Sequence, residues 1–547
     1  MPKLLLVLFF SACALAQPLI FNRSVLNAAS YVPNRLPGGA IAQGSIFSIF
    51  GARLGPTPAA QANAFPLGTT LANVAVTISQ GSNSVNAIPL FVGDGQINAI
   101  MPSNAPVGAA SVRVSYNNAR SNPMTVMIAP SAFGIFTATG TGLGPGILQN
   151  FVSAAVQPIN SATVAAKRGQ AITLWGTGLG PVSADNVAPT AGNLPVKVEV
   201  SVGGVNAAVL YSGRTPCCSG TDQIVFQVPD NAPLECWVPV YVRTAGSTVS
   251  NAVTMAITED GSSCFGFDPP PAFVTGGRSG ALNAFRVTTR QDLGTRAPID
   301  VTADYQSGAA VQVPNTAFPF HPVYSYPPDG TCTMFSVKGD LLRGDPLPGA
   351  QVYGNHLATG SEVTFAGPRG MKVVTNLWPG SLLTYLGGGV TGNFFTNNLF
   401  LDPGKYQVSG VGGIEVEAFS VSVAMPQPLT WTNRDQLLTV DRTQPLNLSW
   451  TGGAADQNVT IAGFGVDLPN NSTSIFGCVA GPGVTRFTVP AAFLSNFPAT
   501  RANPLQSKGV IYLINRPASG SADLKASGLD ISSLVLQSAI GKTVIFR

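Results

Sequence analysis

Apolar and polar residues alternate along much of this chain. In residues 196–202 a valine occupies every second position, with Lys, Glu and Ser between them. The same period of two runs through residues 74–78, 112–114 and 238–242. Because successive side chains of a strand point to opposite faces of a sheet, each run predicts a strand with one buried face. Gly, Pro and Asn separate these short runs, and that spacing is typical of a two-sheet sandwich.

The first half of the chain carries this pattern twice. The segment GSIFSIFGARLGP at 44–56 returns as GQAITLWGTGLGP at 169–181. Three further pairs follow in the same order, at 85–87 and 205–207, 96–106 and 223–233, and 121–122 and 250–251. Four ordered matches predict two copies of one domain of roughly 120 residues.

These repeated segments resemble a known kind of domain. The runs FGARLG at 50–55 and WGTGLG at 175–180 are similar to the start of IPT/TIG immunoglobulin-like domains. The second copy adds YSGRTPCC, DQI, VP, CWVPV and SN, at 211–218, 222–224, 228–229, 236–240 and 250–251. This set resembles the uncharacterised Solibacter C-terminal domain family of secreted bacterial proteins, over about residues 25–265. The resemblance implies a sandwich fold and export, and it carries over no catalytic residue. Two features depart from that family, because the first copy lacks the cysteines and the unit lies in the N-terminal half.

The sequence therefore predicts an all-β protein, with tandem Ig-like β-sandwich domains followed by one or two further β-rich domains. The predicted parts are a signal peptide (1–16), sandwich repeats at 17–135 and 136–265, a Pro-rich linker (266–274), and β-rich domains at 275–426 and 427–547. The linker contains Pro269–Pro271, which stiffen the chain because each proline ring fixes φ. The division near 427 follows the run Met-Pro-Gln-Pro at 425–428, and one short helix is expected at 489–494.

Composition narrows the class of protein. Charged residues make up 10% of the 547 residues, compared with roughly 25% in a typical soluble domain. Apolar residues reach 45%, which argues against a disordered chain. The 60 glycines and 44 prolines argue against a coiled coil or a helical repeat. A net charge of +4 is too diffuse for a nucleic-acid partner, and none is expected.

The chain begins with the parts of a secretory signal peptide. A basic start at Lys3 precedes an apolar run at 4–10 and an A-x-A-like end at 14–16. This order predicts cleavage after Ala16 and a secreted or cell-surface location. The alternative is a lipoprotein anchored through Cys13. The apolar run is too short to cross about 30 Å of hydrocarbon, so no membrane-spanning segment is expected.

Cysteine usage agrees with export. Six cysteines lie beyond the predicted leader, at Cys217, Cys218, Cys236, Cys264, Cys332 and Cys478. An even number in an exported chain predicts disulfides. Adjacent cysteines are poorly placed to bond each other, so Cys217 and Cys218 are each expected to pair with one of Cys236 and Cys264. That leaves Cys332 for Cys478. Zinc is the competing interpretation, but the paired C-x-x-C spacing of a zinc site is missing.

Signatures of catalysis are scarce. The chain has two histidines, His321 and His356, and neither a G-x-S-x-G nor an H-E-x-x-H motif. Both histidines are interpreted as surface or turn residues. Glu415 and Glu417 are a candidate glycosidase pair, but residues two apart on a predicted strand are more simply its solvated side. Arg-Gly-Asp at 343–345 is interpreted as an ordinary turn rather than an adhesion motif.

The glycine clusters are interpreted as turns between strands. The hexapeptide Gly-Thr-Gly-Leu-Gly-Pro occurs at 140–145 and again at 176–181, and neither copy continues with Lys-Ser/Thr as a phosphate loop does. The run Gly-Asp-Gly at 93–95 offers too few oxygen ligands for calcium. No catalytic, cofactor-binding or metal-binding residue is therefore predicted, and no cofactor.

Three functions are compatible with these patterns. The first is an exported, non-catalytic protein that binds a glycan, a cell-surface component or a protein through its sandwich loops. The second is an extracellular polysaccharide hydrolase whose catalytic part is 275–547. The third is a structural envelope or matrix protein. Trp378, Trp431 and Trp450 would favour glycan stacking if they were exposed in a row, and core burial is the simpler expectation.

Overall fold

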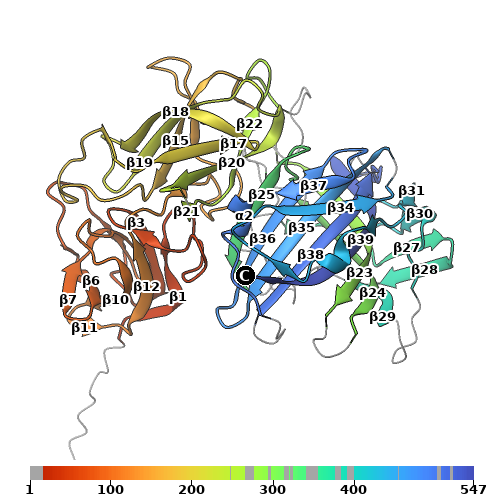
Figure 1. The fold of residues 1–547 in the computed structure, drawn as a ribbon, viewed down its shortest axis with the longest axis horizontal. Coiled ribbons are helices and arrows are strands. Elements are labelled where there is room, and N and C mark those ends of the chain that lie inside the picture. The colour runs from red at the N-terminus through yellow and green to blue at the C-terminus, as the bar shows by residue number, and fades with distance from the viewer. Residues whose placement is uncertain are drawn as a thin grey trace, which may run out of the picture.

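The chain folds almost entirely into β-sheets. The computed structural model describes residues 17–246, 248–264, 276–292, 297–312, 320, 325–339, 355–375, 384–390, 399–453, 455–501, 507–517 and 522–547. The predicted signal peptide and the predicted linker lie outside these residues. Figure 1 shows two sandwiches, red to orange and yellow, beside a larger green-to-blue half.

The first sandwich, repeat 1, packs a five-stranded sheet against a seven-stranded sheet. The first sheet contains β1 (Leu19–Asn27), β3 (Ile46–Ala52), β9 (Gln96–Ile100), β8 (Ile88–Val92) and β4 (Ala60–Gln61). The second contains β2 (Ile41–Ala42), β12 (Met124–Ala129), β10 (Gly108–Tyr116), β6 (Val74–Gln80), β5 (Thr70–Leu71), β7 (Asn83–Asn86) and β11 (Ala119–Arg120). Alternation places Phe47 and Ile49 of β3 opposite Val74, Val76 and Ile78 of β6 in one core. The period of two thus produces the buried face that it predicts.

The second sandwich, repeat 2, pairs its main strands in the same order as repeat 1. Its strands are β13 (Gly134–Ile135), β14 (Leu148–Asn150), β15 (Ala171–Thr177), β16 (Gly192–Asn193), β17 (Val198–Val202), β18 (Val205–Arg214), β19 (Asp222–Gln227), β20 (Glu235–Thr244), β21 (Thr248–Val249) and β22 (Val253–Ile257). One strand, β18, pairs with β17 at its start and with β19 at its end, so the ladders form one continuous sheet of ten strands. In repeat 1 the same stretch is divided into β7 and β8, which pair with β6 and β9. The sequence division at 135 is slightly late, because Gly134 and Ile135 already pair with β15 of repeat 2.

A Ser-Asn pair performs the same task in both repeats. The amide of Asn122 accepts from Ile20 N (2.8 Å) and donates to Ile20 O (3.0 Å), which ties the first strand to the turn before β12. The amide of Asn251 makes the same two bonds with Ile135, at 2.8 and 3.0 Å. It also donates to Gly142 O at 2.9 Å. The recurrence of Ser-Asn in the sequence therefore reflects one side-chain clamp used twice.

The two clamps differ in burial, and this difference predicts unequal effects of mutation. Asn251 is 4% exposed, whereas Asn122 is exposed. Replacing Asn251 by alanine leaves three buried backbone groups without partners, which we expect to cost about 3 kcal/mol of stability. Asn122→Ala is expected to cost about 1 kcal/mol, because water can replace its amide. Urea unfolding of the two variants measures both values, and equal losses would show that burial does not set the cost.

The C-terminal half, residues 276–547, is built on one long sheet. Its ten strands are β25 (Cys332–Lys338), β36 (Ser472–Ala480), β35 (Gln457–Asp467), β38 (Ser507–Pro517), β39 (Ile531–Phe546), β23 (Arg278–Gln291), β24 (Ile299–Gln312), β26 (Asn355–His356), β29 (Thr384–Val390) and β33 (Thr439–Val440). Two smaller sheets cover it, namely β28 (Gly370–Thr375), β27 (Glu362–Gly367), β30 (Gly404–Gly410) and β31 (Phe419–Met425), and then β32 (Thr430–Trp431), β34 (Leu446–Thr451) and β37 (Arg486–Val489). Each covering sheet encloses its own apolar core.

The expected division near residue 427 does not separate two sheets. Strand β23 pairs in parallel with β39 over Ser279–Arg290, so the first and last strands of this half are neighbours. Strand β25 likewise pairs with β36 across the division. The run at 425–428 marks only the passage from one covering sheet to the next.

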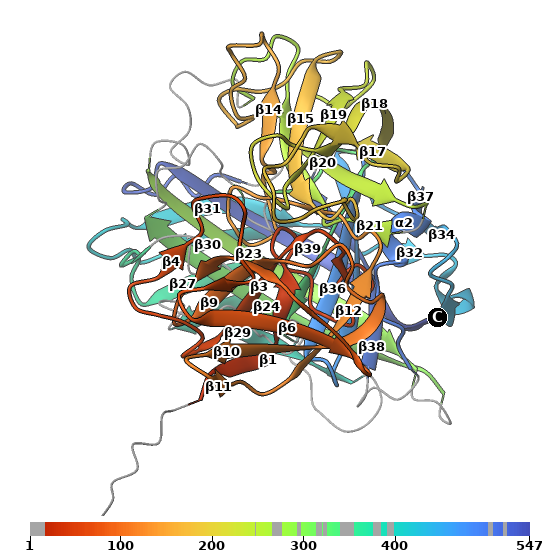
Figure 2. The same cartoon turned by 90° about the vertical axis from the view of Figure 1, so that its left-hand side faces the viewer.

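The C-terminal half also contacts repeat 2. The ring of Tyr241 in β20 lies 5.1 Å from that of Phe493, edge to face. Phe493 belongs to the short helix α2 (Ala491–Leu494), which the sequence predicts. Asn496, just after this helix, donates to Val249 O of β21 at 3.2 Å. Figures 1 and 2 both show β21 beside α2.

Candidate functional site

A cavity of about 350 Å³ lies where repeat 1 meets repeat 2. Most of its wall comes from repeat 1, through Ala28, Ala29, Tyr31, Ile46, Ser48, Gln61, Leu90, Phe91 and Asn98. Repeat 2 supplies Phe136, Thr137 and Gly140. We call this space the inter-repeat cavity. A concave site at a domain junction is a usual place for a small ligand to bind.

Strand alternation explains the repeat 1 wall. Phe47 and Ile49 of β3 point into the core, so Ile46 and Ser48 face the other way, toward the cavity. Across the sheet Ser48 pairs with Asn98 of β9, and its hydroxyl donates to Asn98 Oδ1 at 2.9 Å. Gln96 Nε2 donates to the same oxygen at 2.9 Å. These two bonds fix the amide of Asn98, and its N–H₂ group has no partner among the described residues.

Three aromatic rings supply most of the apolar surface. Tyr31, Phe91 and Phe136 line the cavity and are each half-buried. The Tyr31 ring packs 6.2 Å from that of Phe50, at an angle of 37°. Aromatic rings in a polar setting offer flat apolar faces to a ligand whose edges carry hydrogen-bonding groups.

The wall is uncharged. None of the described residues that line the cavity is an acid, a base or a histidine. General acid–base chemistry needs such a group within hydrogen-bond reach of the substrate. The wall as described therefore suits binding of an uncharged ligand.

A buried ion pair in repeat 2 holds the two repeats together. Asp222 Oδ1 accepts from Arg214 Nη1 at 2.7 Å, and Oδ2 accepts from Gly178 N (2.7 Å) and Leu179 N (2.8 Å). Arg214 Nη2 donates in turn to Gly180 O at 3.1 Å and to Gly44 O of repeat 1 at 2.8 Å. Burial raises the pKa of Asp222 to about 6, against the opposing effects of Arg214 and the two N–H groups.

Further hydrogen bonds join the two repeats. Ile46, which lines it, donates its backbone N–H to Thr177 Oγ1 at 2.8 Å. Ser103 of repeat 1 binds both carboxylate oxygens of Asp185 at 2.7 Å, through its N–H and its hydroxyl. Leu67 N donates to Asn186 O at 2.7 Å. These polar contacts fix the relative position of the walls.

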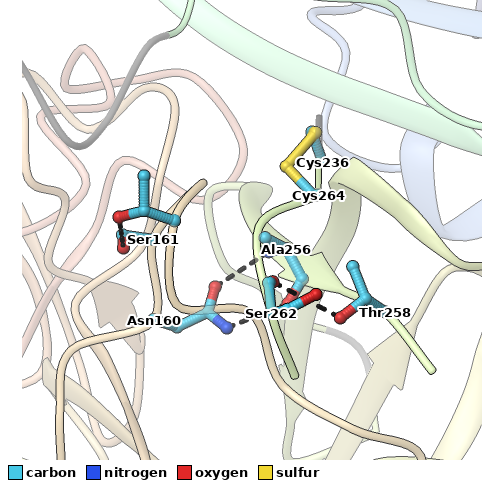
Figure 3. The surroundings of a disulfide bond; sticks show 8 residues. Asn160, Ser161, Cys236, Ala256, Thr258, Ser262 and Cys264 are labelled. Carbon is cyan, nitrogen blue, oxygen red and sulfur yellow. Dashed lines mark hydrogen bonds between the residues drawn. A yellow bond between two sulfur atoms is a disulfide. The ribbon is translucent and has the colours of Figure 1, made fainter. Parts of the chain in front are cut away.

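All six candidate cysteines form disulfides, but one expected pairing is wrong. Cys217 and Cys218 bond each other. Cys236 therefore bonds Cys264, and Figure 3 shows this bridge near the hydrogen bonds that join Asn160 to Ala256. Cys217 and Cys218 lie in the connection between β18 and β19, whereas Cys236 lies in β20. Cys332 bonds Cys478, as the sequence suggests, because these residues are direct partners in the β25–β36 ladder.

The glycine clusters form turns. In the copy at 176–181, Gly178 has φ of +109° and donates its N–H to Asp222. In the other copy Gly142 has φ of +80° and donates to Thr137 Oγ1 at 3.1 Å. Glycine suits both places because it adopts positive φ without strain. The described residues contain no group of three His, Cys, Asp or Glu side chains suited to a metal ion.

The remaining candidates do not form a site. Trp431 and Trp450 are 4% and 2% exposed, so neither is available for stacking on a glycan. Glu415 and Glu417 precede strand β31 instead of lying on a strand, and Glu415 accepts from Ala358 N at 2.7 Å. Trp378, His321 and the run 343–345 lie outside the described residues. For His356, only its backbone position in β26 is described.

Two carboxylates that the sequence does not single out meet at Arg286 in the C-terminal half. Arg286 donates to Asp304 and to Asp402, at 2.7 Å each. Although burial opposes it, hydrogen bonds from Arg369 and Arg286 lower the pKa of Asp402. Asp304 also accepts from the N–H of Phe400 at 2.6 Å. A lowered pKa makes Asp402 unsuited to the general-acid step of glycoside hydrolysis. The contacts of this cluster anchor the segment around residue 400.

Comparisons with known proteins extend this description only slightly. No family model and no curated protein matches the chain. Similar solved structures include the I9–I11 tandem of titin, at 6% identity over 70% of this chain and 94% of that one, with a TM-score of 0.12. Another is the SGBP-B protein of a Bacteroides ovatus mixed-linkage glucan utilization locus, in complex with a heptasaccharide, at 8% identity over 79% and 78%, with a TM-score of 0.13. A third is the N-terminal eight Ig domains of DSCAM, at 10% identity over 94% and 57%, with a TM-score of 0.14. Scores this low give no information about the function of this chain.

Proposed function

We propose that this chain is an exported, non-catalytic protein that binds a neutral saccharide in the inter-repeat cavity. The observation that carries the proposal is the wall of that cavity, where half-buried aromatic rings lie beside uncharged hydrogen-bonding groups. Sugar rings present C–H faces that pack on aromatic rings and hydroxyls that need polar partners. An uncharged wall favours neutral sugars over uronic acids, because a buried carboxylate would lack a cation.

The disulfides of the chain support export. Three disulfides suit an oxidising compartment. Among the described residues no helix combines the length and apolarity needed to cross a membrane. The proposal includes the signal peptide with cleavage after Ala16 and the likeness of the two repeats to IPT/TIG domains.

Substitution of the aromatic wall tests the proposal. The probes are immobilised neutral polysaccharides, namely glucans, mannans and galactans, in affinity electrophoresis with the purified chain. We expect at least one to retard the protein, and Phe91→Ala or Phe136→Ala to weaken that interaction about tenfold or more. The matched control is Phe21→Ala, because Phe21 is 46% exposed on β1 and lies outside the cavity.

Two results would contradict the proposal. One is that no neutral polysaccharide retards the chain. The other is that the Phe91 and Phe136 variants are retarded as strongly as the control. Hydrolysis of a retained polysaccharide would instead favour the enzyme hypothesis.

A further inference from the structure

The hairpin between β18 and β19 carries an unusual covalent feature. Its connecting residues, 215–221, form what we call the cysteine loop, which is closed at its base by the pairing of Arg214 with Asp222. Within it Cys217 and Cys218 are exposed and bonded to each other. Because the two residues are adjacent, their bond closes a small ring through the peptide unit between them. The ring restricts the backbone torsions at this point of the loop.

The cysteine loop is also part of the contact between the two repeats. Two residues after Cys218, Gly220 packs so closely on repeat 1 that an added Cβ would lie 2.7 Å from Ile46 Cγ1. Gly220 O accepts from Thr177 Oγ1 at 2.5 Å, and the same hydroxyl accepts from Ile46 N at 2.8 Å. Ile46 lines the inter-repeat cavity. A short series of contacts therefore leads from the exposed disulfide to the wall of the cavity.

Local bonds couple the ring to this contact. Thr221 N donates to Cys218 O at 3.1 Å, and Cys217 N donates to Thr215 Oγ1 at 3.4 Å. Loss of the ring frees the backbone of Cys217 and Cys218, and this freedom extends to Gly220 through the single residue between them. The Arg214–Asp222 pair is buried at the base of the loop and remains in place.

We propose that the Cys217–Cys218 disulfide stabilises the contact between the repeats, and we call it the latch. Its reduction loosens that contact and weakens ligand binding in the inter-repeat cavity. The effect on binding rests on the proposed function, whereas the effect on the contact does not. The reductant is a dithiol. Two electrons and two protons pass from it to the protein, so the Sγ–Sγ bond breaks, both cysteines become thiols and the reductant becomes a disulfide.

The exposure of the cysteines to solvent makes reduction selective for one of the three disulfides. Cys332 and Cys478 are 5% and 0% exposed, and Cys236 and Cys264 are half-buried, whereas Cys217 and Cys218 are exposed. Thiol–disulfide exchange requires that a thiolate reaches a sulfur atom, so the exposed pair reacts first. Mild treatment with dithiothreitol, followed by alkylation and peptide mapping, identifies a condition that opens this pair alone.

Hydrogen exchange of the full-length protein tests the latch without any ligand. We expect exchange in peptides covering 44–48 and 176–180 to become at least about fivefold faster, both after mild reduction and in the C217S/C218S variant. Peptides covering 74–80, in the core of repeat 1, are the internal control and should be unchanged. Reduction of the variant should have no further effect. An unchanged rate of hydrogen exchange at 44–48 in the reduced protein would contradict the proposal that this disulfide stabilises the contact between the repeats.

Binding is the second readout. For a polysaccharide that retards the untreated chain, we expect at least about fivefold weaker binding in the reduced protein and in the C217S/C218S variant. Faster exchange with undiminished binding would overturn the coupling to the cavity. If no polysaccharide binds the untreated chain, the proposed function fails, and the exchange experiment still decides whether the latch exists.

Discussion

Replacing Asp222 by alanine is expected to destabilise repeat 2 by about 3–5 kcal/mol. The variant leaves the guanidinium of Arg214, a residue that is 5% exposed, without its carboxylate. It also leaves the N–H groups of Gly178 and Leu179 without an acceptor. Removing one partner of a buried ion pair is costly even where the intact pair contributes little, because the other charge stays buried. Chemical denaturation of the full chain at neutral pH measures the loss.

The pH dependence and a surface control make this test specific. Between about pH 4 and 6, Asp222 keeps its proton in the folded protein, because its pKa is raised, but loses it in the unfolded chain. The free energy of unfolding of the wild-type protein therefore falls as the pH rises through this window. Asp222→Ala should lack this dependence. Glu259→Ala is the control, since Glu259 pairs with Arg168 but its side chain is 74% exposed, and it should change stability by less than about 1 kcal/mol. Similar losses in the two variants would contradict the assigned role of the buried pair.

Replacing both Cys332 and Cys478 by alanine is expected to cost the C-terminal half about 4–5 kcal/mol. These cysteines are separated by 146 residues, so their bond limits a very large loop in the unfolded chain. It also joins β25, the edge strand of the long sheet, to the neighbouring strand β36. Trp431 and Trp450 are buried in the adjoining core, and their fluorescence follows the unfolding of this half.

The shorter disulfide provides the comparison. Cys236 and Cys264 are separated by 28 residues, and their double alanine variant should lose about 3 kcal/mol in repeat 2. A larger loss for this pair than for Cys332 and Cys478 would show that loop length does not set the order of the two effects.

Local patterns in the sequence predict the strands and the repeat well. The alternating valines of 198–202 form β17, with Val200 and Val202 in the core. The recurring Ser-Asn pair marks equivalent clamps in both repeats. These features could be predicted because each depends on residues close together in the chain, or on one motif copied with its surroundings.

The remaining features depend on distant residues. The division at 427 does not separate two sheets, because β23 and β39, which are about 250 residues apart, pair in one sheet. The bond between Cys217 and Cys218 depends on how the hairpin turns, which cysteine spacing alone does not reveal. The inter-repeat cavity combines Phe91 with Phe136 across a domain junction. The sequence offers one local sign of this cavity. The outward-facing side of β3, where a polar residue is expected, carries Phe50, and the Phe50 ring packs on that of Tyr31 in the cavity wall.

A crystal structure of the chain with a bound neutral oligosaccharide tests the central claim most directly. The proposal predicts a sugar ring packed on Phe91 or Phe136, with hydroxyl groups within hydrogen-bond reach of Asn98 or Gln61. A saccharide bound elsewhere on the molecule, with none in the inter-repeat cavity, would contradict it.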